Sequence, residues 1–134
     1  MTTENLVPRL EMCKEIPEGC FADSALVWLV SKTSGKSFVF PRKFHISSEK
    51  SVIGAPAPTL AEIMEALPRS ICADGQKYYL GQLSDTETCR WKICYGASSF
   101  YGLAILRGPC AADKNPAIAA LRVWLSLNDE GGLK

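Results

Sequence analysis

The sequence has little net charge and no long apolar run, and both absences exclude classes of protein. Lysine and arginine together number 15 and aspartate and glutamate 14, which leaves a formal net charge of +1. Bulk charge therefore gives no general reason to bind nucleic acid, an anionic membrane or an acidic substrate. No window approaches the roughly 18 apolar residues that a membrane-spanning helix needs, and MTTENLVPRLEMCKE contains no apolar stretch of signal-peptide length. We therefore expect a cytoplasmic protein with no membrane contact.

The motifs of common enzyme classes are also missing. No Gly-x-Gly-x-x-Gly, Walker-type phosphate loop or Gly-x-Ser-x-Gly elbow occurs in the chain. The sequence has 1 histidine, His45, and no Cys-x-x-Cys pair, so the usual ligand pattern of a zinc site is absent. We expect no cofactor and no metal, and an enzyme is the minority interpretation.

Cysteine is better represented, with 6 residues in a chain of 134. This density lies below the roughly 8–10% of disulfide scaffolds, and the expected compartment is reducing, so we predict free and mostly buried thiols. A cysteine nucleophile would need His45 beside a thiol and a third group to orient the imidazole, and nothing in the sequence places them together. An enzyme with a cysteine nucleophile stays as one alternative.

The hydrophobic content of 47% is enough for one compact domain over residues 1–134 with its own core. The pattern of segments predicts an α+β fold, with an antiparallel sheet of about four to five strands and helices packed on one face. Few of the strands can be assigned to partners from the sequence alone, but two hairpins stand out.

The first hairpin is expected to join a central strand at 24–30 to a strand at 37–44, and the second to join 77–83 to 89–96. The intervening segment 45–58 is polar and then rich in alanine and proline, so we expect a surface loop there. In the last of these strands, alternation predicts that the core-facing side chains are Cys89, Trp91, Ile93 and Tyr95 and the outward-facing ones Arg90, Lys92 and Cys94.

A central helix is well marked in PTLAEIMEALP. Thr59 and Glu62 have the spacing of a capping box, in which each side chain accepts a hydrogen bond from the other residue's backbone amide. The apolar residues Leu60, Ile63, Met64 and Leu67 fall on one face, which must be buried.

The last predicted helix is NPAIAALRVWLSLN, residues 115–128, in which Asn115 is the expected N-cap. At about 12 residues and roughly 1.5 Å per residue, this helix is too short to cross a hydrocarbon core of about 30 Å. Its main apolar stripe contains Ile118, Leu121, Trp124 and Leu125, and the outward strip Ala119, Arg122 and Ser126. We expect Val123 and Leu127 to be covered by the same chain, so a monomer is favoured and a homodimer is the alternative.

One stretch, FVFPRKFH at residues 38–45, has the character of a binding surface. Aromatic rings that stack on bases, interleaved with cations that neutralise phosphate, suit single-stranded nucleic acid. The simpler interpretation is that the rings pack inward and the charges mark a solvated strand end. Because net basic charge is missing, nucleic acid is disfavoured, and a weak single-stranded nucleic-acid binder stays as an alternative. The candidate binding residues are Phe40, Arg42, Lys43, Phe44 and His45.

A resemblance adds to this interpretation. The capped central helix lies within APTLAEIMEALP, the Trp-containing C-terminal helix within NPAIAALRVWLSL, and a third distinctive stretch is CKEIPEGCFADSALVWLV. Together these stretches resemble small uncharacterised single-domain proteins of phages and prophage-rich gut bacteria. The resemblance implies a mobile-element origin and a small α+β fold, and it supplies no catalytic residue. We expect an accessory or protein-binding module without a catalytic site, acting on an unknown protein partner.

Overall fold

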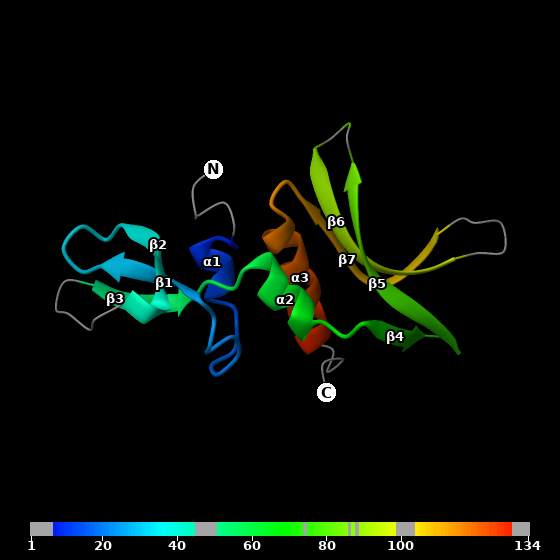
Figure 1. Cartoon of the computed structure of the whole chain (residues 1–134), viewed down its shortest axis with the longest axis horizontal. Helices are drawn as coiled ribbons and strands as arrows, with labels where there is room; N and C mark the ends of the chain where they lie inside the picture. Colours follow the sequence, from blue (N-terminus) through cyan, green and yellow to red (C-terminus); the bar gives the residue numbers. More distant parts are fainter. Residues whose placement is uncertain are drawn as a thin grey trace. The chain divides into compact units, whose positions relative to one another are not determined.

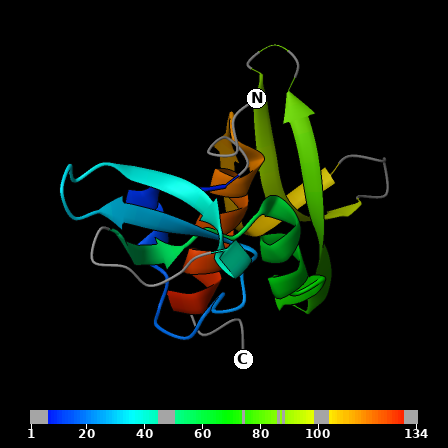
Figure 2. The same ribbon diagram turned by 60° about the vertical axis from the view of Figure 1, so that its left-hand side comes forward.

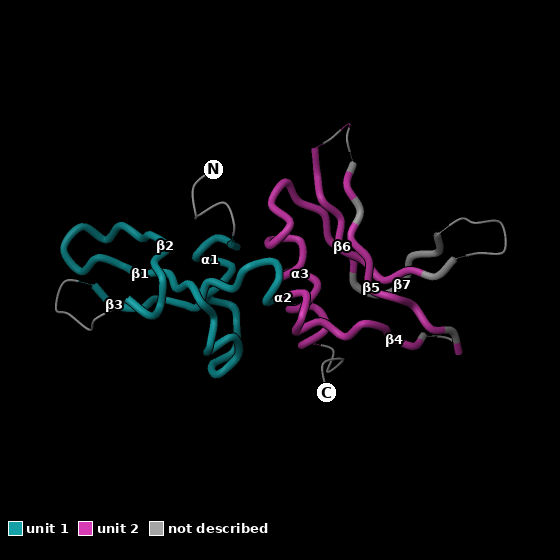
Figure 3. The backbone as a smooth tube through the Cα atoms, in the orientation of Figure 1, with its two compact units in different colours: residues 1–62 teal, residues 63–134 magenta. Residues whose placement is uncertain are grey.

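The computed structural model describes residues 7–44, 51–73, 75–85, 87, 89–98 and 104–129. The chain divides into two compact units, Met1–Glu62 and Ile63–Lys134, which Figure 3 distinguishes by colour. Each unit has an antiparallel sheet and helical residues, so the predicted α+β class is confirmed. The strands are shared between two sheets instead of one. That the whole chain is a single domain stays a prediction.

The first unit is built on a three-stranded antiparallel sheet in the order β2-β1-β3 (Figures 1 and 2). The strands are β1 (Leu26–Ser31), β2 (Ser37–Pro41) and β3 (Ser51–Pro56), and η2 (Arg42–Phe44) is a short 3-10 helix after β2. β1 is the central strand, as its apolar sequence predicts, and it forms the expected hairpin with β2. Its buried residues supply much of the core of this unit.

The strand β3 corrects the prediction of a surface loop at 45–58. Residues 51–56 pair with β1, with Ser51 opposite Ser31 and Pro56 opposite Val27. Gly54 and the prolines around it are weak strand formers, so the local sequence indicated a loop. A Cβ on Gly54 would lie 2.9 Å from Cγ2 of Val30, so glycine here permits the close packing of β3.

The short helix α1 (Leu10–Cys13) and the segment before it are anchored to β1 through one carbonyl group. The indole Nε1 of Trp28 donates a hydrogen bond to the carbonyl oxygen of Pro8 at 3.0 Å, and the Cys13 thiol donates to the same oxygen at 3.5 Å. Both donors are buried, so this carbonyl oxygen is paired inside the core.

The helix α2 (Leu60–Ala66) begins with the predicted capping box. Oε1 of Glu62 accepts a hydrogen bond from the backbone N–H of Thr59 at 2.9 Å, and Oγ1 of Thr59 accepts one from the N–H of Glu62 at 3.4 Å. Oε2 of Glu62 also accepts from the backbone N–H of Ala25 at 3.1 Å, which ties the start of α2 to the segment before β1. Ile63 and Leu67 are buried, as the apolar face requires.

Replacing Thr59 with alanine is expected to lower the free energy of unfolding by about 1 kcal/mol, because an orphan helical amide loses its acceptor. Urea denaturation measured by circular dichroism checks this value. Thr59→Ser keeps the hydroxyl group and should stay within a few tenths of a kcal/mol of the wild type. Equal stability of all three proteins would contradict the role of the cap.

The second unit contains a four-stranded antiparallel sheet in the order β4-β5-β6-β7. Its strands are β4 (Ser70–Ala73), β5 (Gln76–Asp85), β6 (Arg90–Ser98) and β7 (Ala104–Asp113), and the predicted hairpin is the pair β5–β6 (Figure 1). The helix α3 (Pro116–Asp129) packs against β6 and β7. This unit alone therefore has a sheet of the predicted size with a helix packed against it.

The alternation predicted for residues 89–96 is wrong at three positions, one of which is Trp91, expected in the core but 38% exposed. Cys89 is exposed and lies in the turn before β6 with a φ of 56°, while Cys94, expected outside, is buried between Ile93 and Tyr95. Cys94 lies at a shift of register: Ile93 lies opposite Ala111, but Tyr95 lies opposite Arg107. Three residues of β7 thus face Cys94, and such a bulge interrupts the period of two.

The helix α3 begins as its sequence predicts, because Oδ1 of Asn115 accepts a hydrogen bond from the N–H of Ala117 at 2.9 Å. Val123 and Leu127 are buried within the single chain, as expected, and so is Trp124. Ala119, assigned to the outward strip, is buried as well, because its small side chain lets the neighbouring structure approach. Within the described part of the chain, no helix is both long and apolar enough to span a membrane.

Candidate functional site

The segment predicted to bind nucleic acid contains both packed and exposed side chains. The ring of Phe40 is half-buried and lies edge-on to the ring of Phe38, with centroids 6.4 Å apart and an interplanar angle of 89°. This pair occupies the strand β2, where the rings support the sheet as well as the surface. Edge-to-face contacts of this kind stabilise the pair and restrict both rings.

Arg42 makes structural contacts in the first unit. Its Nε donates a hydrogen bond to the carbonyl oxygen of Ser24 at 2.8 Å, and one guanidinium nitrogen donates to Oγ of Ser24 at 3.1 Å. Ser24 is buried, with 2% of its surface exposed. The guanidinium therefore holds the segment that leads into β1. Two of its donors are used in these contacts and are turned away from a phosphate group.

Lys43 and Phe44 are the exposed part of the segment. The Nζ of Lys43 lies 5.0 Å from the centroid of the Phe44 ring, within the range of a cation–π contact. The Phe44 side chain is 62% exposed. His45 lies outside the described residues, so the structure brings two of the five predicted binding residues together at the surface.

A hollow of about 560 Å³ borders the strand β3 in the first unit. We call it the β3 groove. It touches four consecutive residues of β3, so it runs along the strand instead of covering one face of the sheet. Its lining, as far as the structure describes it, consists of 16–20, Ala22, Arg42 and 53–56.

The backbone of β3 is available on one side. Within the described residues β1 is its one neighbour in the sheet, so β3 is an edge strand. The outward N–H and C=O groups of an edge strand are a template for pairing with another chain. The sequence did not reveal this site, because residues 51–56 were expected to form a loop.

Exposed apolar side chains accompany this edge. Val52 and Ile53 of β3 are 41% and 42% exposed, whereas Phe38, which is 39% exposed, lies on β2 at the opposite edge of the sheet. Phe44 is also exposed. These residues of the first unit outnumber the large exposed apolar side chains described in the second unit, which are Tyr79 and Trp91. Exposed apolar side chains that gather on one part of a surface mark a site of interaction.

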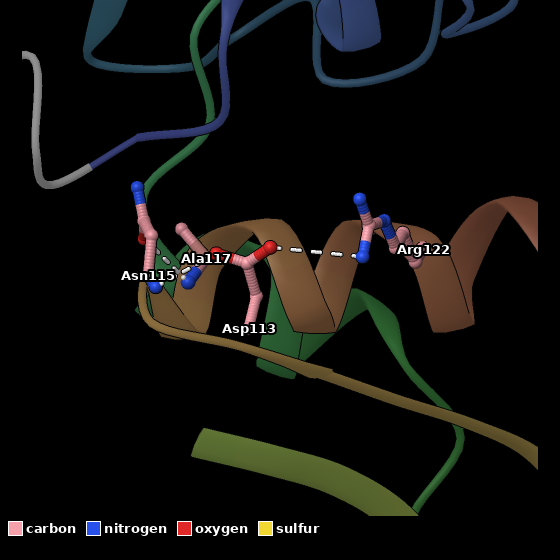
Figure 4. Close-up of polar contacts among 4 residues, drawn as sticks. All are labelled: Asp113, Asn115, Ala117 and Arg122. Carbon is pink, nitrogen blue, oxygen red and sulfur yellow. Dashed lines mark hydrogen bonds and ion pairs between the residues drawn. The ribbon is translucent and has the colours of Figure 1, made fainter. Parts of the chain in front are cut away.

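A second hollow, of about 350 Å³, lies at the start of α3 in the second unit. Oδ2 of Asp113 lies 3.6 Å from a guanidinium nitrogen of Arg122, and Oδ1 of Asp113 accepts a hydrogen bond from the N–H of Asn115 at 3.0 Å (Figure 4). Arg90 and Lys114 complete its charged lining among the described residues, so three cations surround one carboxylate. The carboxylate is engaged through both oxygens, and its contacts order the first turn of α3.

The prediction that most thiols are buried is wrong. Cys13 and Cys94 are buried and Cys20 is half-buried, but the other three, on β4, before β6 and on β7, are exposed: Cys72, Cys89 and Cys110. Burial raises the pKa of Cys13 to about 12, and burial also raises the pKa of Cys94. Both thiols therefore stay protonated at neutral pH, where a thiol is a poor nucleophile.

The β3 groove is thus the best-defined candidate site. In the described ranges no group of three or more histidine, cysteine, aspartate or glutamate side chains is arranged to hold a metal ion. The groove combines an edge strand with exposed apolar side chains, which is an arrangement found where extended peptides bind. In comparisons with known proteins, the chain matches no family model, no curated protein and no solved structure.

Proposed function

We propose that the protein is a small protein-binding module, and that an extended segment of a partner protein binds in the β3 groove. The observation that carries the proposal is an edge strand whose residues line a hollow of about 560 Å³. An extended peptide that adds to a sheet edge gains main-chain hydrogen bonds, and pockets for its alternate side chains give specificity.

The composition of β3 suits such a ligand. Gly54 packs against Val30 of the same unit, so β3 is held closely in the sheet at this point. Val52 and Ile53 offer exposed apolar surface beside it. The ligand that fits is therefore an extended segment with apolar side chains, and its affinity would come from backbone pairing and burial of these side chains.

Accessory action on a protein partner agrees with the absence of catalytic motifs from the sequence. The mobile-element origin is part of the proposal and rests on the resemblance of the three stretches to phage and prophage proteins. The cytoplasmic location and the monomeric state also stay predictions.

The alternative of nucleic-acid binding rests on Lys43 and Phe44, which lie together at the surface. A stacking ring beside a cation is the unit that binds single strands without sequence preference. Arg42, the other described cation of residues 38–45, instead binds Ser24. One ring and one cation form a smaller site than the β3 groove, so we favour the protein partner.

The proposal can be tested by selecting extended peptides of random sequence from a display library against the full chain. Selected peptides should bind with a Kd that rises at least about tenfold for Ile53→Lys, because the charge removes apolar contact area beside the strand. Tyr79→Lys is the matched control, since Tyr79 is an exposed apolar residue of the second unit. A selected peptide methylated at its backbone nitrogens should lose binding, since strand addition needs those amides.

Two outcomes would count against the proposal. In the first, the library yields no peptide whose binding depends on Ile53. In the second, a fluorescently labelled single-stranded oligonucleotide binds, and the binding falls with added salt and is lost in Lys43→Ala. The second result would favour the nucleic-acid alternative.

A further inference from the structure

Two cysteines of the second unit lie on neighbouring strands beside the same shift of register. Trp91, Lys92 and Ile93 of β6 pair in register with residues 113, 112 and 111 of β7. Continued by one position, this register places Cys94 opposite Cys110, at the point where the regular pairing stops. The nearby Cys110 is one of the groups that raise the pKa of Cys94, which agrees with this placement.

Directly opposed residues of antiparallel strands have Cα atoms roughly 4.5–5.5 Å apart, and a disulfide needs about 4.4–6.8 Å. The irregular register also gives the backbone room to adjust, because a bulge is less tightly constrained than a regular ladder. A continued register would thus place the two cysteines within the spacing that a disulfide requires.

The two thiols differ in their access to solvent. Cys110 is exposed, whereas Cys94 is 3% exposed. Burial raises the pKa of Cys94, a nearby Lys92 lowers it by less, and the thiol of Cys94 is the form present at neutral pH. An oxidant arriving from solvent therefore meets Cys110 first, and Cys94 is positioned to react second.

We propose that Cys94 and Cys110 form an oxidative modification site, at which a small disulfide oxidant converts the two thiols into one cross-strand disulfide. The thiolate of Cys110 attacks one sulfur of oxidised glutathione, which forms a mixed disulfide and releases one glutathione thiolate that takes up a proton. Cys94 loses its proton and attacks the Cys110 sulfur, releasing the second glutathione. Two electrons pass from the protein to glutathione disulfide, which leaves as two molecules of glutathione.

The disulfide joins β6 to β7, the strands against which α3 packs. It restricts the unfolded chain between residues 94 and 110, so the oxidised protein is more stable than the reduced one. Because glutathione reverses the exchange, the modification follows the redox poise of the compartment.

The site can be tested by incubating the folded full chain in buffers of increasing ratio of oxidised to reduced glutathione. Free thiols are then blocked with N-ethylmaleimide, and the intact mass and proteolytic peptides are measured. We expect the loss of two hydrogens, a linked peptide containing Cys94 and Cys110, and a rise in Tm of at least about 5 °C.

Two variants distinguish the Cys94–Cys110 pair from the other thiols of the chain. Cys110→Ser changes an exposed residue and should abolish the linked peptide, leaving Cys94 as a free thiol. Cys72→Ser is the matched control, because Cys72 is also an exposed cysteine on a strand of the same unit, and it should leave the linkage intact. A stable glutathione adduct on Cys110 in the wild type, or a loss of two hydrogens that persists in Cys110→Ser, would overturn the proposal.

Discussion

Replacing Val123 with glutamate is expected to unfold the protein. Val123 lies in α3, is 1% exposed, and is covered by the chain itself. A carboxylate at this position would lose its water of hydration without gaining a cation or a set of hydrogen-bond donors. An uncompensated buried charge costs about 3–5 kcal/mol, which is a large part of the roughly 5–15 kcal/mol that stabilises a typical domain.

Circular dichroism and sedimentation of the Val123→Glu variant provide the measurement. Ser126→Glu adds the same charge to an exposed position of the same helix, and it should keep the spectrum and the Tm of the wild type. A folded Val123→Glu monomer obtained from a dimeric wild type would show that α3 meets a second subunit, contrary to the burial seen in one chain.

Raising the pH above 9 is expected to destabilise the protein, with the larger part of the effect between pH 10 and 12. Burial raises the pKa of Tyr95 to about 12, and its hydroxyl group donates a hydrogen bond to the carbonyl oxygen of Pro68 at 2.7 Å. An unfolded tyrosine ionises near pH 10, so the unfolded chain releases a proton that the folded protein retains. The stabilisation is complete below pH 10 and is lost as the pH rises toward 12.

The difference between the two pKa values of Tyr95 corresponds to about 2–3 kcal/mol. The stabilisation that Cys13 provides is also lost as the pH rises, and the loss begins at a lower pH. Burial raises the pKa of this thiol from 9.0 to about 12. Its contribution is present below pH 9 and declines from there as the pH increases.

Thermal unfolding at intervals between pH 8 and 11.5 tests this dependence. Tyr95→Phe should lose about 1 kcal/mol at neutral pH with the hydrogen bond to Pro68, but its Tm should fall less steeply above pH 10. Tyr79→Phe changes an exposed tyrosine and should reproduce the wild-type profile. The same steep decline in Tyr95→Phe would show that another group is responsible.

Local signals made several elements predictable from the sequence. Thr59 and Glu62 are three residues apart, and Asn115 is followed directly by its helix, so the caps of α2 and α3 depend on neighbours within one turn. The hairpins of β1 with β2 and of β5 with β6 join strands that follow one another along the chain. Their apolar runs and polar connections were sufficient because the partners are close in sequence.

The candidate site depended on contacts that no local pattern contains. Residues 51–56 become β3 because β1, about twenty residues earlier, supplies the pairing that a segment with Gly54 and Pro56 does not favour by itself. The sequence offered Arg42 as one candidate binding residue, but in the structure its guanidinium donates to Ser24. Which group a long cationic side chain binds depends on the partners that the fold brings near it.

The sequence by itself determined the α+β class, the capped helices and the burial of α3, because these depend on periodicity and on neighbours along the chain. Only the tertiary structure decided that β3 lines a groove at a sheet edge and that the register of β6 and β7 shifts beside Cys94 and Cys110. Both features arise where the register of a strand pair shifts, between Trp28 and Leu29 of β1 and between Ile93 and Tyr95 of β6. A shift of register depends on how two distant strands fit together, which the period of either strand alone does not encode.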